Sequence, residues 1–335
     1  MNPALQGLIT IIIGVGGCVG YFYGSNLFLD KVLYPARGPH IGRNITRANM
    51  IRPWLFLAPA LLALTVYLAY PVIETLRLSL TQRLPGGGYE FVGLQNYNKM
   101  FAEPKFWEAL QNNLLWLIVV PALSTMFGLL AAQLSDRIRW GNLAKSLIFM
   151  PMAISFVGAA VIWKLVYDTR PIDQEQIGVL NALYLFFGGS APQTWLTIPF
   201  WNSFFLMIVL IWIQTGFAMV ILSAALRGVP EDTIEAAIVD GANPFQIFFK
   251  IKVPQIMGTI VVVWTTITIV VLKVFDIVFA MTNGQWETQV LANYMYDKLF
   301  RANDWGIGSA SAMIIMLLVT PILIWNVYNA RKEMR

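Results

Sequence analysis

A short polar segment between two apolar stretches holds the residues with the most informative spacing. It contains Pro230, the acidic residues Glu231, Asp232 and Glu235, and then Gly241. Proline at a first helical position, acids in the first turns and glycine just past the end together predict one short, well-capped helix. The chemistry that such a helix offers is polar contact with a partner. We therefore interpret it as a docking element and not as a catalytic one.

The same segment continues into a second helical run that leads towards the membrane. Ala236 and Ala237 leave the first helix thin, and an amphipathic run, 245–252, follows the glycine turn. A thin helix can be pressed into a groove on another protein while Pro254 starts the next apolar span. This arrangement predicts that force passes from a partner to the membrane. The alternative is a linker in which glycine and proline merely punctuate two helices.

The order of these residues resembles a known motif. Glu-Ala-Ala at 235–237 is followed after three residues by Gly241, and after nine more by Ile251-Lys252-Val253-Pro254. This pattern resembles the EAA loop of permease subunits in binding-protein-dependent ABC importers. The Asp-Gly-Ala run at 240–242 and the Phe-Phe-Lys-Ile run at 248–251 are similar to the carbohydrate branch of that family. Val253 stands where leucine is usual.

The resemblance implies a coupling role for this loop and a set of partners. The residues that it implies for ATPase coupling are Glu235, Ala236, Ala237, Asp240, Gly241, Ile251 and Pro254. It places ATP and Mg on two partner ATPase subunits, so we expect this chain to bind no cofactor itself. The other implied partners are a second permease subunit, in a heterodimer, and an extracytoplasmic sugar-binding protein. Transport would then follow alternating access.

The composition places the chain in a bilayer. Of its 335 residues 57% are hydrophobic and only 12% are charged, which is about half the usual charged share. A membrane-spanning helix needs roughly 20 apolar residues, and a window free of charge is the clearest sign of one. Seven such windows are present: 1–29, 54–70, 109–135, 146–163, 197–226, 253–272 and 305–330. The sequence therefore predicts an all-α, polytopic membrane protein with about seven spans.

Lysine and arginine gather in alternate loops and at the C-terminus. These basic residues are Lys31, Arg37, Arg43, Arg47, Arg52, Arg137, Arg139, Lys145, Arg227, Lys250, Lys252, Arg331, Lys332 and Arg335. Because short cytoplasmic loops carry such an excess, we expect the EAA loop and the C-terminus in the cytoplasm and the N-terminus outside. The expected location is the inner (plasma) membrane of a bacterium or archaeon. Topology also explains the net charge of +5 better than a nucleic-acid partner does.

The counts of reactive residues exclude several enzyme classes. Cys18 is the only cysteine and His40 the only histidine, so no disulfide and no Cys/His metal cluster can form within the chain. No Gly-Lys pair occurs, so the phosphate-binding loop of a nucleotide hydrolase is missing. We therefore expect a transport subunit that is not an enzyme, with ATP hydrolysis left to its partners.

Three parts of the chain follow from these patterns. We predict an N-terminal transmembrane anchor helix at 1–30, a basic cytoplasmic linker at 31–53 and an ABC permease transmembrane domain at 54–335. Within the last part, 227–254 forms the cytoplasmic EAA coupling loop, called the coupling loop below. The runs Gly14-Val15-Gly16-Gly17-Cys18 and 21–26 resemble alpha-glucoside permeases. That resemblance implies an alpha-glucoside or disaccharide as cargo.

Polar side chains inside a span are candidates for the cargo pathway, because they are costly there unless they face a partner or water. Gln214 and Thr215 lie midway along 197–226 and are flanked by Trp212 and Phe217, whose rings could stack on a sugar. These four residues are the predicted substrate pathway. The alternative is that Gln214 bonds a neighbouring helix and the aromatic rings pack against lipid.

Two other functions compete with a sugar importer. An ion-coupled secondary carrier would use intramembrane charges, for which Lys273 and Asp276 are the candidates. Three residues apart, they are expected on one helix face, where they could neutralise each other. An ABC permease for cargo other than sugar is the second alternative, because selectivity rests largely with a separate binding protein.

Overall fold

The computed structural model describes residues 3–35, 37, 41–136 and 138–333, with the backbone alone for 326, 327 and 329–333. His40, Arg137 and Arg335, which the sequence analysis named, lie outside the described residues. The chain divides into two compact units, 1–74 and 75–335. Each unit is described by itself.

The first unit is a helical hairpin. Helix α1 (Pro3–Phe28) runs into a π-helical turn, η1 (Leu29–Leu33), and returns as α2 (Ile41–Leu64), η2 (Thr65–Ala69) and the start of α3 (Tyr70–Ser79). The Tyr21 hydroxyl donates to the carbonyl of Leu55 at 2.8 Å, and Arg52 pairs with Asp30 at 2.6 Å. Residues 41–53, expected in a basic linker, are therefore helical and continuous with the next span. The three domain boundaries stay predictions.

The second unit is almost entirely helical. One small antiparallel hairpin pairs β1 (Thr81–Arg83) with β2 (Tyr89–Phe91), in a register that sets Gln82 opposite Glu90. The helical elements that follow are α4 (Gln95–Ala102), α5 (Pro104–Ser135), α6 (Gly141–Phe149), η3 (Met150–Ala153), α7 (Phe156–Val166), α8 (Val179–Phe186), η4 (Trp195–Thr197), α9 (Trp201–Arg227), α10 (Glu231–Val239), α11 (Pro244–Gln246), η5 (Ile247–Lys252), α12 (Val253–Gln255), α13 (Met257–Leu272), α14 (Asp276–Met281), α15 (Leu291–Tyr296), η6 (Asp297–Arg301) and α16 (Trp305–Glu333).

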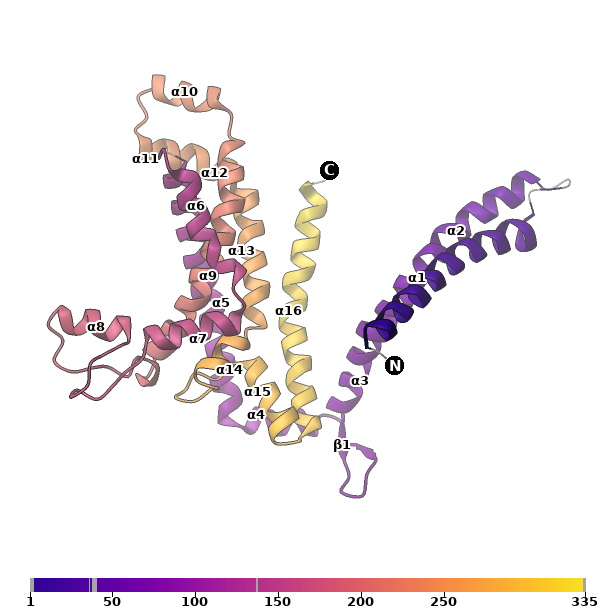
Figure 1. Cartoon of the computed structure of the whole chain (residues 1–335), viewed down its shortest axis with the longest axis horizontal. Helices are drawn as coiled ribbons and strands as arrows, with labels where there is room; N and C mark the ends of the chain where they lie inside the picture. Colours follow the sequence, from indigo (N-terminus) through magenta and orange to yellow (C-terminus); the bar gives the residue numbers. More distant parts are fainter. Residues whose placement is uncertain (1–2, 36, 38–40, 137, 334–335) are drawn as a thin grey trace. The chain divides into compact units, whose positions relative to one another are not determined.

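The core of this unit forms where α9 packs along α5, and α13 contacts both of these helices. A helix that is apolar all round must be covered on every face, and α9 is the most deeply buried of the long helices. Small residues allow close contact, because a Cβ at Gly128 would lie 2.4 Å from that of Ala218. Figure 1 shows α10 at one end of the bundle and α4 and α15 at the opposite end.

Among the described residues, five helices are long and apolar enough to cross a membrane, and the number rises to seven if each of two bent helix pairs is counted as one span. The fold class is therefore confirmed. Two windows differ from the predicted single helices. The span expected at 146–163 bends by 106° between η3 and α7, and the span expected at 253–272 bends by 71° between α12 and α13.

Local chemistry accounts for the first of these breaks. Pro151 opens the 3₁₀ turn η3, and Ile154 then adopts extended backbone angles. Ser155 starts a new helix, because its hydroxyl accepts a hydrogen bond from the backbone N–H of Gly158 at 3.1 Å. At the second break Pro254 lies inside the short α12 instead of opening the long helix, and the chain turns at Ile256.

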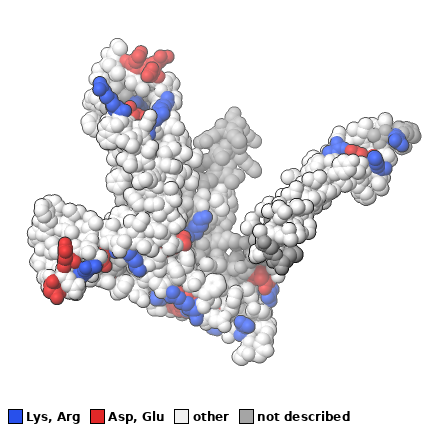
Figure 2. All heavy atoms as spheres, viewed as in Figure 1, with Lys and Arg blue, Asp and Glu red and all other residues white. Residues whose placement is uncertain are grey.

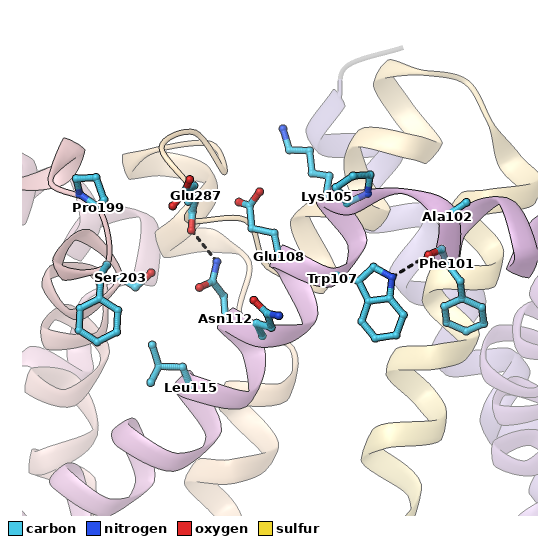
Figure 3. Close-up of a pocket in the computed structure, with 13 residues that line it drawn as sticks. Phe101, Ala102, Lys105, Trp107, Glu108, Asn112, Leu115, Pro199, Ser203 and Glu287 are labelled. Atoms are coloured by element: carbon cyan, nitrogen blue, oxygen red, sulfur yellow. Dashed lines mark hydrogen bonds between the residues drawn. The ribbon is translucent and has the colours of Figure 1, made fainter.

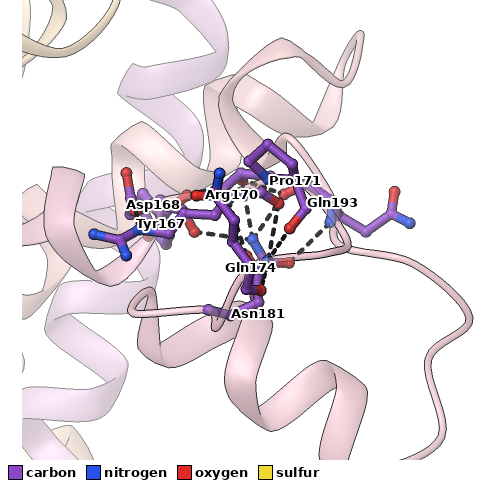
Figure 4. Close-up of polar contacts among 9 residues, drawn as sticks. Tyr167, Asp168, Arg170, Pro171, Gln174, Asn181 and Gln193 are labelled. Atoms are coloured by element: carbon purple, nitrogen blue, oxygen red, sulfur yellow. Dashed lines mark hydrogen bonds and ion pairs between the residues drawn. The ribbon is translucent and has the colours of Figure 1, made fainter.

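A long excursion between α7 and α9 carries α8. Buried Asn181 holds it together: its amide donates to the carbonyls of Asp168 at 2.9 Å and Gln193 at 3.0 Å, and its oxygen accepts from the Gln193 N–H at 2.9 Å (Figure 4). The Gln176 amide adds a bond to the carbonyl of Arg170 at 2.8 Å. Side chains therefore replace the ladder hydrogen bonds that this irregular backbone lacks.

Candidate functional site

The helix of the coupling loop begins one residue later than predicted. Pro230 is not helical (ψ 132°) but precedes the first helical residue, Glu231. Glu231 and Asp232 occupy the first turn, where the unpaired N–H groups and the helix dipole favour negative charge. The result is the short acidic helix that the sequence predicts.

Gly241 ends this helix in a Schellman motif. The N–H of Ala242 bonds the carbonyl of Ala237 at 2.9 Å, and the N–H of Gly241 bonds that of Ile238 at 3.0 Å. Gly241 has a φ of +80°, which strains any residue with a side chain, although a Cβ there would meet nothing within 4 Å. The requirement for glycine within this chain is therefore conformational and not steric.

The helix presents a mixed surface to solvent. Glu235, Ala236 and Asp240 are exposed, whereas Ala237 is buried against the loop. Val239 is 87% exposed, which is unusual for a branched apolar side chain. Figure 2 shows the acidic side chains gathered over the end of the bundle that α10 forms. An exposed apolar side chain next to acidic ones is typical of a surface that binds another protein.

The second half of the coupling loop anchors it to the bundle. Asn243 and Gln246 form a reciprocal capping box at the start of α11, and η5 follows as a wide π-helical turn. Ile247 and Phe248 point inward and are buried, whereas Phe245 is 75% exposed. Ile251 is half-buried and Pro254 exposed. The coupling residues thus lie on two helical runs, and α10 is the one that projects.

The four predicted pathway residues do not form one surface. Thr215 bonds the carbonyl of Ile211 in its own helix at 2.7 Å, and Trp212 makes an edge contact with Trp163 of α7. At 100° per residue, positions 212 and 214 lie about 200° apart around α9. Gln214 is 6% exposed, and within the described residues its side chain has no hydrogen-bond partner. Bonding of Gln214 to a neighbouring helix is therefore not observed.

The two intramembrane charges lie at a break in the helices. Lys273 ends α13 and Asp276 begins α14, so the two residues do not share the helix face expected from their spacing. Within the described ranges no ion pair joins them, although both line a cavity of about 250 Å³. Phe156, the first residue of α7, lines the same cavity. The break at the start of α7 therefore lies beside the junction between α13 and α14.

A larger cavity opens at the end of the bundle opposite the coupling loop. It has a volume of about 1150 Å³ and is lined by α5, the end of α4, the start of α9 and Glu287 (Figure 3). Lys105, Glu108 and Asn112 follow one face of α5 into it. On the far wall Phe200 adopts a left-handed backbone (φ 67°), which is strained for an aromatic residue.

Asparagines brace the loop beside this cavity. The Asn112 amide donates to the carbonyls of Glu287 at 2.8 Å and Gln289 at 2.9 Å. Buried Asn113 accepts from the N–H of Leu291 at 2.8 Å. Sequence reasoning missed the cavity. The signal that could have identified it is the polar run Gln111–Asn113 near the start of the window 109–135.

Comparison with known proteins places this architecture in a family. Residues 124–334 match the family described as "Binding-protein-dependent transport system inner membrane component". The chain is 62% identical over 337 residues to the alpha-glucoside transport system permease protein AglF of Rhizobium meliloti, covering 99% of both chains. It is 48% identical over 283 residues to the osmoprotective compounds uptake permease protein GgtC of Synechocystis, covering 84% of this chain and 100% of that protein.

A solved structure has the same fold. A chain of a bacterial ABC transporter that imports the acidic polysaccharide alginate superposes with a TM-score of 0.72 at 20% identity, over 87% of this chain and 98% of that one. The family match covers most of the membrane bundle and includes the whole coupling loop. The chain therefore belongs to the binding-protein-dependent transport system inner membrane components, as a multi-pass permease subunit of an ABC importer.

Proposed function

We propose that this permease imports an alpha-glucoside or a related disaccharide. The observation that carries the proposal is the 62% identity to an alpha-glucoside permease across 99% of both chains. Identity on this scale extends through the helices that line the bundle and through both broken spans. The similarity therefore covers the whole membrane bundle and not one part of it.

The coupling loop is the proposed dock for an ATPase subunit. In support, α10 projects from the bundle, exposes Glu235 and Val239, and is joined to α9 by only Gly228, Val229 and Pro230. A short tether transmits displacement better than a long one. Closure of an ATPase dimer on ATP would carry α10 with it, and hydrolysis would reset it. ATP and Mg are bound by these partners.

The opposite end is the proposed contact for an extracytoplasmic binding protein. The cavity beside Glu108 and Asn112 lies there, and its mixed lining suits a polar, hydrated partner. This assignment places the coupling loop and the C-terminus in the cytoplasm and the N-terminus outside. A second permease subunit, as a heterodimer partner, would complete the pathway.

We place the cargo pathway along the break before α7 and the junction between α13 and α14, which line one cavity. Broken helices expose backbone groups that bind polar ligands near the middle of a membrane, and a charge such as Lys273 is tolerated only beside water or a partner. Gln214 remains a candidate because it is a polar side chain midway along α9 that is almost fully buried. Trp212, Thr215 and Phe217 are candidates of lower rank, since packing or self-bonding already accounts for the first two.

A second candidate cargo is a small osmoprotective solute. The 48% identity to an osmoprotectant uptake permease, over the whole length of that protein, favours it. The ion-coupled carrier is no longer an alternative, because the chain belongs to an ABC importer family and Lys273 does not pair with Asp276.

Reconstitution of the co-purified complex in liposomes tests the proposal. ATP is enclosed on the ATPase side, and uptake of labelled maltose, trehalose and sucrose is followed beside that of a labelled osmoprotective solute. We expect ATP-dependent uptake of an alpha-glucoside, which Glu235→Gln with Gly241→Val abolishes. Uptake of the osmoprotective solute alone would replace the cargo assignment. Uptake that ignores ATP but follows an ion gradient would refute the mechanism.

A further inference from the structure

A cluster of charges lies beneath the coupling loop, where three helices end. Asp136 caps α5, Lys145 belongs to α6, and Arg227 is the last residue of α9. Lys145 Nζ lies 2.5 Å from Asp136 Oδ1, and Arg227 Nη2 lies 3.1 Å from the same oxygen. One carboxylate oxygen thus holds a cation from each of the two other helices.

Ser223 closes the cluster. It is buried on α9, accepts from Lys145 Nζ at 2.7 Å and donates to Asp136 Oδ2 at 3.3 Å. The side chain of Lys145 is only 15% exposed and that of Asp136 28%, so water screens this pair less than it would a surface pair. Removal of the charge on Asp136 or on Lys145 therefore leaves the other charge partly buried and without its partner.

The position of Asp136 is unfavourable without these cations. It follows the C-terminus of α5, where the helix dipole repels a negative charge. Burial raises its pKa, but the Lys145 hydrogen bond and the charges of Lys145 and Arg227 outweigh burial and hold the pKa below its ordinary value. The carboxylate is thus ionised and depends on its two partners.

Two close backbone contacts make α6 rigid with its neighbours. A Cβ at Gly141 would lie 2.0 Å from the carbonyl of Ser135, so the turn from α5 to α6 is tight. A Cβ at Gly216 would lie 2.7 Å from the carbonyl of Ile148, so α6 also touches the backbone of α9. Movement of the end of α9 therefore cannot leave α6 behind while the charge cluster holds.

We propose that Asp136, with Lys145 and Arg227, forms a clamp that transmits movement of α10 to the broken span of α6 and α7. Arg227 lies four residues before Glu231, so a short connection links displacement of α10 to the clamp. Asp136 is a positioning residue: it touches neither cargo nor nucleotide, and it determines how much cargo moves for each ATP hydrolysed. The inference rests on the proposed function.

The test measures uptake and ATP hydrolysis together, in the reconstituted complex. Asp136→Asn should leave hydrolysis active while cargo moved per ATP falls roughly fivefold or more, the lower range of coupling between linked sites. Lys145→Gln and Arg227→Gln, which each leave one cation, should lower the same ratio, and Lys145→Arg should restore most of it. If the complex with Asp136→Asn does not assemble, the ratio measured in Lys145→Gln and Arg227→Gln tests the proposal instead.

Asp168→Asn is the matched control, because it removes a carboxylate whose partner, Arg170 at 3.7 Å, is substantially exposed. It should leave the ratio unchanged. The proposal is overturned by an unchanged ratio in the assembled clamp variants. It is equally overturned by a parallel fall of uptake and hydrolysis, because a purely structural role predicts that result.

A readout without cargo separates the clamp from the proposed function. In a Cys18→Ser background, Ala153→Cys places a thiol at the exposed break between η3 and α7. ATP should change the rate at which this thiol reacts with a maleimide, and Asp136→Asn should remove the change. If the wild-type complex moves none of the tested solutes, the cargo assignment fails. If ATP still changes the rate of the maleimide reaction in Asp136→Asn, the clamp is refuted.

Discussion

Gly241 shows how one residue shapes the coupling loop. Its φ of +80° costs a branched L-residue about 1–2 kcal/mol, and asparagine less. We therefore expect Gly241→Val to unwind the Schellman turn and to lower ATP-driven uptake strongly, and Gly241→Asn to have a mild effect. Uptake by the reconstituted complex is the measurement.

The control for Gly241 lies elsewhere in the chain. Gly188 has a φ of +94°, and a Cβ there would also meet nothing within 4 Å. Gly188→Val carries the same conformational strain far from the coupling loop, so coupled uptake should be retained. Equal losses in both variants would mean that general destabilisation, and not the loop geometry, explains the result.

Asp136 predicts a pH dependence. Because its pKa is depressed in the folded protein, its contribution to stability is complete above the ordinary aspartate pKa of about 4 and is lost as pH falls through the lower folded value. Cargo moved per ATP should therefore be constant between about pH 6 and 8. A ratio that falls from pH 8 to pH 6 in wild type, but not in Asp136→Asn, would contradict an ionised carboxylate.

At the scale of elements, the excursion that carries α8 depends on one buried side chain. Asn181→Ala leaves the carbonyl of Asp168 and the N–H of Gln193 without their Asn181 partner, at a cost of about 1–3 kcal/mol. Amide exchange between residues 168 and 193 should accelerate by roughly ten- to hundredfold. Gln174→Ala, an exposed change in the same loop, should leave exchange as it is. Unchanged protection in Asn181→Ala would show that the loop is held by other contacts.

Much of the element pattern could be predicted from the sequence, because charge-free windows and helix signals are local. The acids before Gly241 predict α10 to within one residue at its start. The breaks in the two bent spans could not be predicted in this way. The window 146–163 carries no charge, so its hydropathy is the same whether the chain runs straight or restarts at Ser155.

The sites were only partly predictable for a related reason. The coupling loop is continuous in sequence, so spacing alone identifies it. The cavity at the other end joins Glu108 to Phe200 and Glu287, which are far apart in the chain, and no local pattern connects them. The aromatic residues around Gln214 form a single cluster in the sequence. Because successive residues turn around the helix axis, Trp212 and Gln214 lie on different faces of α9.

At the scale of the molecule, the second unit contains its own core. Both buried hydrophobic clusters consist of residues between Tyr97 and Leu318, and no described residue of 1–74 belongs to either. Deletion of 1–33 should therefore leave the bundle folded and the complex assembled. Size-exclusion chromatography and ATP-driven uptake measure this outcome.

Trp116→Ala provides the comparison for that deletion. Trp116 is 1% exposed in the core, and its truncation should cost about 3–5 kcal/mol and reduce the yield of assembled complex. A truncated chain that assembles no better than Trp116→Ala would show that the N-terminal hairpin is part of the folding unit.

The short tethers of α10 also bear on how such importers diversify. The helix joins the bundle through three residues on one side and four on the other, and its exposed face packs against nothing in the described chain. Substitutions on the surface of α10 therefore need no repacking of the core. Substitutions in the core that alter which cargo is bound likewise need no change in α10. Selection can act on the motor interface and on the cargo route as separate traits, so one ATPase can serve several permeases.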